Sequence, residues 1–135
     1  MEKPDEIKEE LCFGCGKDNP IGLNLNFREE GEEYVTEFTP QKYYQGYPNI
    51  MHGGITTTIL DEAMGQYLFR KGMVAPTAEI NVRFKKAIPI DDTIKVTARI
   101  ISQKGRMIEM SALAILPSGV IAAEGKGKFI VKQKL

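Results

Sequence analysis

The chain has 135 residues, its 18 basic and 18 acidic side chains balance, and 42% of its residues are hydrophobic. A chain of this length folds as one domain with a substantial core, and zero net charge gives no electrostatic reason to expect nucleic-acid binding. Its apolar runs are too short to cross a bilayer, and its charged first ten residues lack the apolar core of a signal peptide. We therefore expect a single cytoplasmic domain over residues 1–135, without a nucleic-acid or membrane partner.

The N-terminal lead-in, residues 1–20, contains a Cys-x-x-Cys pair, Cys12 and Cys15. Such a pair can be half of a zinc site or a redox dithiol. A structural zinc site takes four ligands, and the only histidine, His52, lies forty residues away. A redox pair would open a helix, whereas the glycines and the proline around these cysteines indicate a loop. We expect two small apolar side chains in this loop, and neither a metal nor a cofactor.

The next elements follow from hydrophobic periodicity. Alternating apolar and polar residues predict strands over residues 21–27 and 34–38, joined by a turn at residues 30–32. After a tyrosine-rich loop, a helix is expected from about Gly54 to Arg70, closed by Gly72. The β-branched residues that open it would also suit a strand, but the apolar pattern lasts too long for one.

The expected helix is apolar or small almost all the way round, which indicates that it is buried on every side. Gly65 in its interior suggests that another element packs closely there. The same helix carries two adjacent carboxylates, Asp61 and Glu62. Burying charge is unfavourable unless something pairs with it or uses it, so these acids are the main indication of function.

The rest of the chain predicts four more strands, over residues 77–87, 93–102, 107–116 and 120–131. In the first of these, alternation places Ala78, Ile80, Val82 and Phe84 on one face and Thr77 on the other. Because short turns join the strands, most neighbours should be antiparallel. The sequence thus predicts an α+β fold, with one curved antiparallel sheet wrapped around one long central helix.

This order of elements, with His52-Gly53-Gly54 opening the helix and Asp61 nine residues after the histidine, resembles the hotdog-fold acyl-CoA thioesterases. The phenylacetic-acid-type branch, within the 4-hydroxybenzoyl-CoA thioesterase-like superfamily, is the most similar, and the resemblance covers nearly the whole chain. It implies a hotdog fold, an acyl-CoA substrate hydrolysed to free acid and CoA, and sites built across a homodimer, which can pair further into a homotetramer.

The resemblance also implies roles for single residues. Asp61 matches the nucleophile or general base, and the choice between these two stays open. Gly53 matches the amide that polarises the thioester carbonyl. His52 matches a residue that positions that loop or the thioester, and Thr77 one that helps to hold the attacking water.

The residues support part of this chemistry on their own. A helix N-terminus offers free backbone N–H groups with partial positive charge, and glycines there let a substrate approach them. Gly53 and Asp61 are eight residues apart, which is about 12 Å along a helix. One carbonyl cannot contact both residues of one chain. If both serve one substrate, the acid must come from a second, antiparallel helix, and hence from a two-fold dimer.

Five further residues are candidates for binding the substrate. The basic ones could contact the phosphates of CoA, although a solvated strand face has the same appearance. The candidates are Asn49, Gly54, Arg83, Lys85 and Lys86.

Two other functions compete with thioester hydrolysis. Residues 62–66 resemble a segment of the hotdog acyl-carrier dehydratases and hydratases. Those enzymes pair the glutamate with a histidine about fourteen residues earlier, where this chain has Pro48. The other alternative is a non-catalytic protein that binds acyl-CoA, against which the presence of Asp61 weighs. The sequence leaves the acyl group open.

Overall fold

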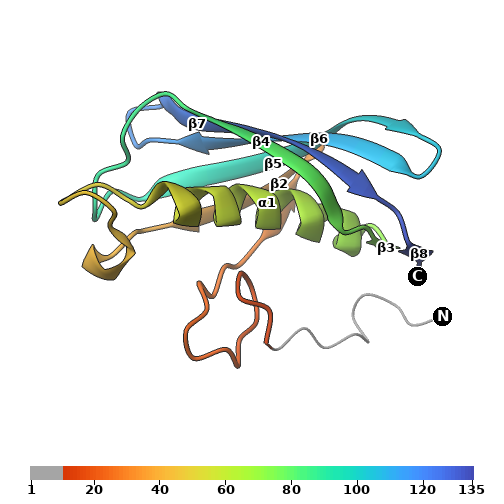
Figure 1. Ribbon diagram of the computed structural model, residues 1–135, viewed down its shortest axis with the longest axis horizontal. Helices are drawn as coiled ribbons and strands as arrows, with labels where there is room; N and C mark the ends of the chain where they lie inside the picture. Colours follow the sequence, from red (N-terminus) through yellow and green to blue (C-terminus); the bar gives the residue numbers. More distant parts are fainter. Residues whose placement is uncertain (1–10) are drawn as a thin grey trace.

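The computed structural model describes residues 11–135, so the first ten residues of the predicted lead-in lie outside the described part. One long helix, α1 (Gly53–Arg70), packs against one face of a curved six-stranded sheet (Figure 1). All neighbouring strands are antiparallel, and their order is β1-β2-β5-β6-β7-β4. This confirms the predicted α+β architecture.

The strands of the main sheet are β1 (Arg28–Glu30), β2 (Glu33–Phe38), β4 (Thr77–Phe84), β5 (Ile94–Lys104), β6 (Met107–Ile115) and β7 (Ile121–Ile130). A short 3-10 helix, η2 (Lys42–Tyr44), precedes α1. A two-stranded sheet pairs β3 (Met73–Val74) with β8 (Gln133–Lys134). These last two strands are too short to leave a periodic pattern in the sequence.

The sequence predicted a helix that is buried on every side, and this was wrong. The sheet covers one face, on which Ile59, Leu60, Ala63, Met64 and Leu68 have no exposed surface. Other positions around α1 remain partly exposed in the single chain: Ile55, Thr57, Asp61, Gly65 and Phe69. One side of the helix, with both apolar and polar residues, is therefore only partly covered by the residues that the structure describes.

The close approach of helix and sheet occurs at glycines of β7, not at Gly65. A side chain at Gly127 would clash with the Phe129 ring, and one at Gly125 would lie 3.4 Å from Leu60. At Gly65 the nearest atom would be 3.7 Å away, which is an ordinary contact. The missing Cβ atoms of β7 thus set how closely α1 lies on the sheet.

Residues 21–27 do not form the predicted strand. Leu23 and Leu25 are buried, as the alternation indicated, but Asn24 has a positive φ of 53°, which no strand allows. The N–H groups of these two leucines donate to the carbonyls of Phe13 and Gly14, at 2.8 and 2.9 Å. The segment therefore holds the cysteine loop in place instead of joining the sheet.

Candidate active site

His52 caps the N-terminus of α1. Its backbone is extended, and its Nδ1 accepts a 2.8 Å hydrogen bond from the Gly54 N–H. Because Nδ1 is the acceptor, a neutral imidazole carries its proton on Nε2. The His52 N–H donates to the Tyr44 carbonyl at 2.8 Å, which ties the cap to η2. The histidine thus ties the loop that leads into the helix to the first turn of α1.

The two glycines after His52 serve different purposes. The Gly54 N–H is occupied by the imidazole, and a side chain at Gly54 would lie only 2.9 Å from the ring. No acceptor for the Gly53 N–H lies among residues 11–135. Gly53, not Gly54, therefore has the amide that can donate to a substrate, while Gly54 makes room for the cap.

A pocket of about 740 Å³ lies beside this end of α1. The Phe84 ring, from the end of β4, lies 3.4 Å from the position that a side chain at Gly53 would take. The lining is largely apolar, and its cationic side chains are those of Lys85 and Lys86, which directly follow β4. It consists of Gly46, Tyr47, Ile50, Met51, His52, Gly53, Thr56, Phe84, Lys85, Lys86, Ala87 and Ile88.

Asp61 lies two turns further along α1, on its partly exposed side, and accepts a 2.6 Å hydrogen bond from the hydroxyl of Thr77. Alternation placed Thr77 on the outer face of β4, and this was wrong. Thr77 pairs with Phe129 and Glu79 with Lys128, so Ala78 is an extra residue in the ladder. This bulge turns Thr77 to the helix side, where it contacts the acid.

Glu62 points away from Asp61, toward the N-terminal loop. The Cys12 thiol donates to its Oε1 at 3.1 Å, and Cys15 lies beside both groups. Burial raises the pKa of the Cys15 thiol far above its usual range, and the neighbouring Glu62 carboxylate and Cys12 add to this rise. The dehydratase hypothesis needs Glu62 to face a histidine, and in this chain it faces two thiols.

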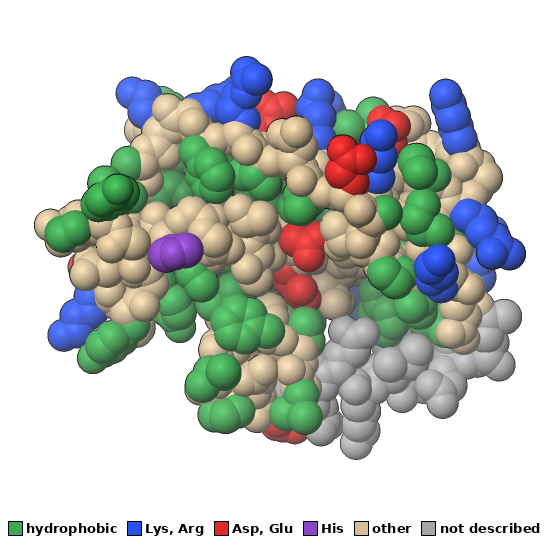
Figure 2. All heavy atoms as spheres, viewed as in Figure 1, with side chains coloured by type: hydrophobic (Ala, Val, Ile, Leu, Met, Phe, Trp, Pro, Cys, Tyr) green, Lys and Arg blue, Asp and Glu red, His purple; other side chains and the backbone are tan. Residues whose placement is uncertain are grey.

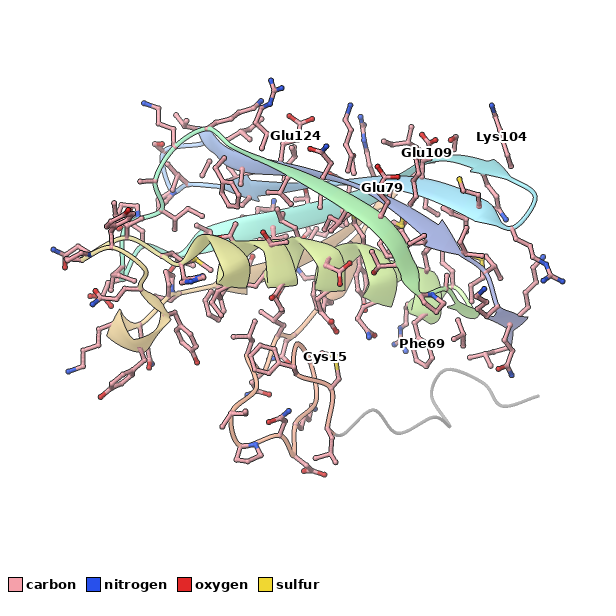
Figure 3. The ribbon with its side chains drawn as sticks, in the orientation of Figure 1. Cys15, Phe69, Glu79, Lys104, Glu109 and Glu124 are labelled. Atoms are coloured by element: carbon pink, nitrogen blue, oxygen red, sulfur yellow. The ribbon has the colours of Figure 1, made fainter. Side chains whose placement is uncertain are left out.

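The candidate phosphate-binding residues divide into two groups. Lys85 and Lys86 line the pocket at the start of α1. Arg83 lies opposite Glu124 on the outer face of the sheet, the side on which Figure 3 shows Glu79, Glu109 and Glu124. Charged side chains gather over this outer face in Figure 2. Arg83 therefore does not reach the pocket.

Two candidates have further contacts. Lys85 donates to Glu124 at 3.1 Å and holds the pKa of that carboxyl below its usual range. Asn49 has a positive φ of 66° and shapes the loop, because its N–H donates to the Gln45 side chain and its carbonyl accepts from Ile90. It is absent from the pocket lining.

Sequence reasoning missed two features of the site. Phe84, counted only as a strand residue, covers Gly53 and lines the pocket. The contact of Cys12 and Cys15 with Glu62 joins residues fifty positions apart. No local sequence pattern signals this contact, because it joins the N-terminal loop to the middle of α1.

Comparisons with known proteins agree with this fold. The family model of the thioesterase superfamily matches residues 48–122, more than half of the chain. Acyl-coenzyme A thioesterase THEM4 of Rattus norvegicus is 35% identical over 111 residues, which cover 82% of this chain and 46% of that protein. The chain spans about half the length of the curated relatives that it matches first.

Solved structures are similar as well. Protein RHA08564, a thioesterase superfamily protein, has a TM-score of 0.85 at 21% identity, over 93% of this chain and 62% of that one. The protein smu.793 of Streptococcus mutans UA159, solved bound to acetyl CoA, has a TM-score of 0.77 at 17% identity, over 82% and 90%. The chain belongs to the thioesterase superfamily and has its hotdog fold. In residues 11–135, no helix is long and apolar enough to cross a membrane.

Proposed function

We propose that this protein is an acyl-CoA thioesterase whose active site is completed by a second copy of the chain. The observation that carries the proposal is the pair of half-sites on α1: a free Gly53 N–H at its start, and an Asp61 carboxylate held by Thr77 two turns later. The superfamily and the name of the THEM4 relative support the same reaction class.

The helix runs without interruption from Gly53 to Arg70, so these half-sites lie about 12 Å apart in one chain. The edge strand β4 offers a way to bring them together. It has no neighbour on its outer side among residues 11–135, and a free strand edge can pair with another chain. Thr77, beside Asp61, is at one end of β4, and Phe84, beside Gly53, is at the other.

A two-fold axis near the middle of β4 would therefore place Thr77 of one chain level with Phe84 of the other. The same axis would set the two α1 helices side by side and antiparallel, with Asp61 of one chain facing Gly53 of the other. It would also cover the side of α1 around Asp61 and Gly65, which is partly exposed in the single chain. Two equivalent sites result from one isologous interface.

At such a site the thioester carbonyl accepts from the Gly53 N–H, which stabilises the oxyanion that forms as the nucleophile adds to the acyl carbon. Asp61 either takes a proton from water as the water oxygen bonds to the acyl carbon, or attacks that carbon itself before water opens the resulting anhydride. Both routes release a free acid and the CoA thiol. Lys85 and Lys86, in the pocket lining, are the cations that contact the CoA phosphates in this proposal, and the acetyl-CoA complex of the similar Streptococcus mutans protein supports a CoA ligand.

The proposal is tested by measuring thiol release from a panel of acyl-CoAs with wild type and matched carboxylate variants. Asp61→Asn keeps the size and the Thr77 hydrogen bond but not the basicity, so kcat should fall roughly 10²–10⁴-fold with little change in KM. Glu62→Gln should lose roughly tenfold or less.

A pair of variants at Gly53 tests the amide. Gly53→Pro removes the N–H at a first-turn position that suits proline, so kcat should fall roughly 10²–10³-fold. Gly53→Ala, which adds a Cβ at the same place but keeps the N–H, should retain most activity. An inactive Glu62→Gln beside an active Asp61→Asn would favour the dehydratase instead. Tight binding of acyl-CoA without any thiol release would identify a non-catalytic binding protein.

A further inference from the structure

We propose that Cys12, Cys15 and Glu62 form a zinc site that fastens the N-terminal loop to α1. The ligand atoms of these three residues lie within 4.8 Å of one another, and all three side chains are partly buried. Figure 3 shows Cys15 on the loop beneath α1, on the side opposite to the sheet. The site is separate from the proposed active site and does not rest on the proposed function.

The donor set suits zinc. In a tetrahedral site with Zn–S of about 2.3 Å and Zn–O of about 2.1 Å, a sulfur and an oxygen lie about 3.6 Å apart and two sulfurs about 3.8 Å apart. The Cys12 sulfur and the Glu62 oxygen are 3.1 Å apart, so small side-chain rotations suffice. Two thiolates favour zinc over the hard cations magnesium and calcium.

The loop is shaped to present both sulfurs to the helix. The Gly16 N–H donates to the Cys12 carbonyl at 2.8 Å, which closes a tight turn around the Cys-x-x-Cys pair. At Gly14 a side chain would clash with Cγ and Cδ of Glu62, so the loop backbone lies directly against the carboxylate. This turn and the leucine hydrogen bonds described above hold the three donors together before any ion binds.

Solvent can reach the three donors, because all of their side chains are only partly buried in the described chain. Cys15 also lines a pocket of about 500 Å³, which borders the loop and the C-terminal half of α1. Water can therefore supply the fourth ligand. The sequence argument against zinc counted thiols and histidine only, and Glu62 is the ligand that it omitted.

The experiment measures metal in the full chain, produced without a histidine tag in zinc-supplemented medium and purified without chelators. Elemental analysis should find about one zinc per chain in wild type and less than about 0.1 in the Cys12→Ser, Cys15→Ser double variant. In competition with a chromogenic chelator, Glu62→Gln should bind zinc at least roughly tenfold more weakly. Asp61→Asn, which changes the neighbouring carboxylate, should keep a full equivalent.

A second measurement remains valid if the double variant does not fold. The reduced, metal-free wild-type chain is titrated with Co²⁺, and a thiolate-to-cobalt charge-transfer band should grow to saturation at about one equivalent. Two results would overturn the proposal: wild type that holds almost no zinc even after reconstitution under reducing conditions and gives no cobalt band, or zinc binding that the double variant retains. Loss of hydrolysis in Asp61→Asn with zinc retained would show that the two sites are independent.

Discussion

At the residue scale, the two adjacent carboxylates of α1 point in different directions and have different partners. Asp61 turns toward β4 and meets the Thr77 hydroxyl, whereas Glu62 turns toward the N-terminal loop and meets the cysteines. Consecutive helix positions differ by about 100°, so neighbours in sequence face different surroundings. One carboxylate is thus available for chemistry and the other for holding the loop.

His52 allows a separate prediction about capping. His52→Asn should keep the cap, because an asparagine oxygen can accept from the same N–H, and should retain both stability and most hydrolysis. His52→Ala should lower the free energy of unfolding by about 1 kcal/mol. Chemical denaturation and steady-state kinetics of the two variants check this. A large kcat loss in a stable His52→Asn would instead indicate that the imidazole contacts the thioester.

At the element scale, strand β7 sets the distance between sheet and helix. Two of its positions that face the helix are the glycines Gly125 and Gly127. Leu60 and Met64 of α1 lie against them, where side chains of β7 would otherwise be. The surrounding residues have no exposed surface, so they cannot move aside freely. The sequence pattern identified this strand but could not identify what its glycines contact, because that contact crosses from β7 to α1.

Two variants on this strand form a matched pair. Gly127→Ala would press its methyl group into the Phe129 ring and against Met64, and should lower the free energy of unfolding by about 1–3 kcal/mol. In Gly125→Ala the added methyl group lies 3.4 Å from Leu60, so the free energy of unfolding should fall clearly less. Urea unfolding followed by circular dichroism gives both values. Equal losses would mean that the core adjusts around Phe129.

Prediction from sequence succeeded where the signal was local. The helix from about Gly54, its end before Gly72 and the antiparallel run β5-β6-β7 follow from periodicity and turn residues. The place of β4 does not: sequence neighbours were expected to pair, whereas β4 pairs with β7 and β5 pairs with β2. Prediction also failed where a single residue changed the outcome: Asn24 with its positive φ prevents a strand, and the extra Ala78 turns Thr77 to the other face. Hydrophobic patterns do not report such irregularities.

At the scale of the whole molecule, the single chain is structurally incomplete for the proposed chemistry. Three features adjoin β4: its own edge, which no strand of residues 11–135 covers, the partly exposed side of α1 with Asp61, and the two separated half-sites, which Thr77 and Phe84 contact at its ends. One interface would resolve all three. This convergence is the physical reason to expect a homodimer as the smallest active unit.

The final prediction tests that interface at its proposed centre. Asn81 lies in the middle of β4 on the outer face of the sheet, opposite Lys126 of its own chain. Asn81→Glu should be tolerated within one chain, because the new carboxylate faces that lysine. Across the two-fold axis, however, it would face either its own counterpart or Glu79 of the partner, and like charges directly opposite destabilise strand pairing.

We expect wild type to be a dimer by light scattering. The dissociation constant of the Asn81→Glu dimer should be at least roughly tenfold higher than that of wild type. Its specific activity should fall on dilution in parallel with dissociation, because each site needs both chains. Gln41→Glu adds the same charge in the exposed loop before η2 and should change neither property. A stable wild-type monomer with full activity would refute the shared site, and would require Asp61 and Gly53 to act on different parts of the substrate within one chain.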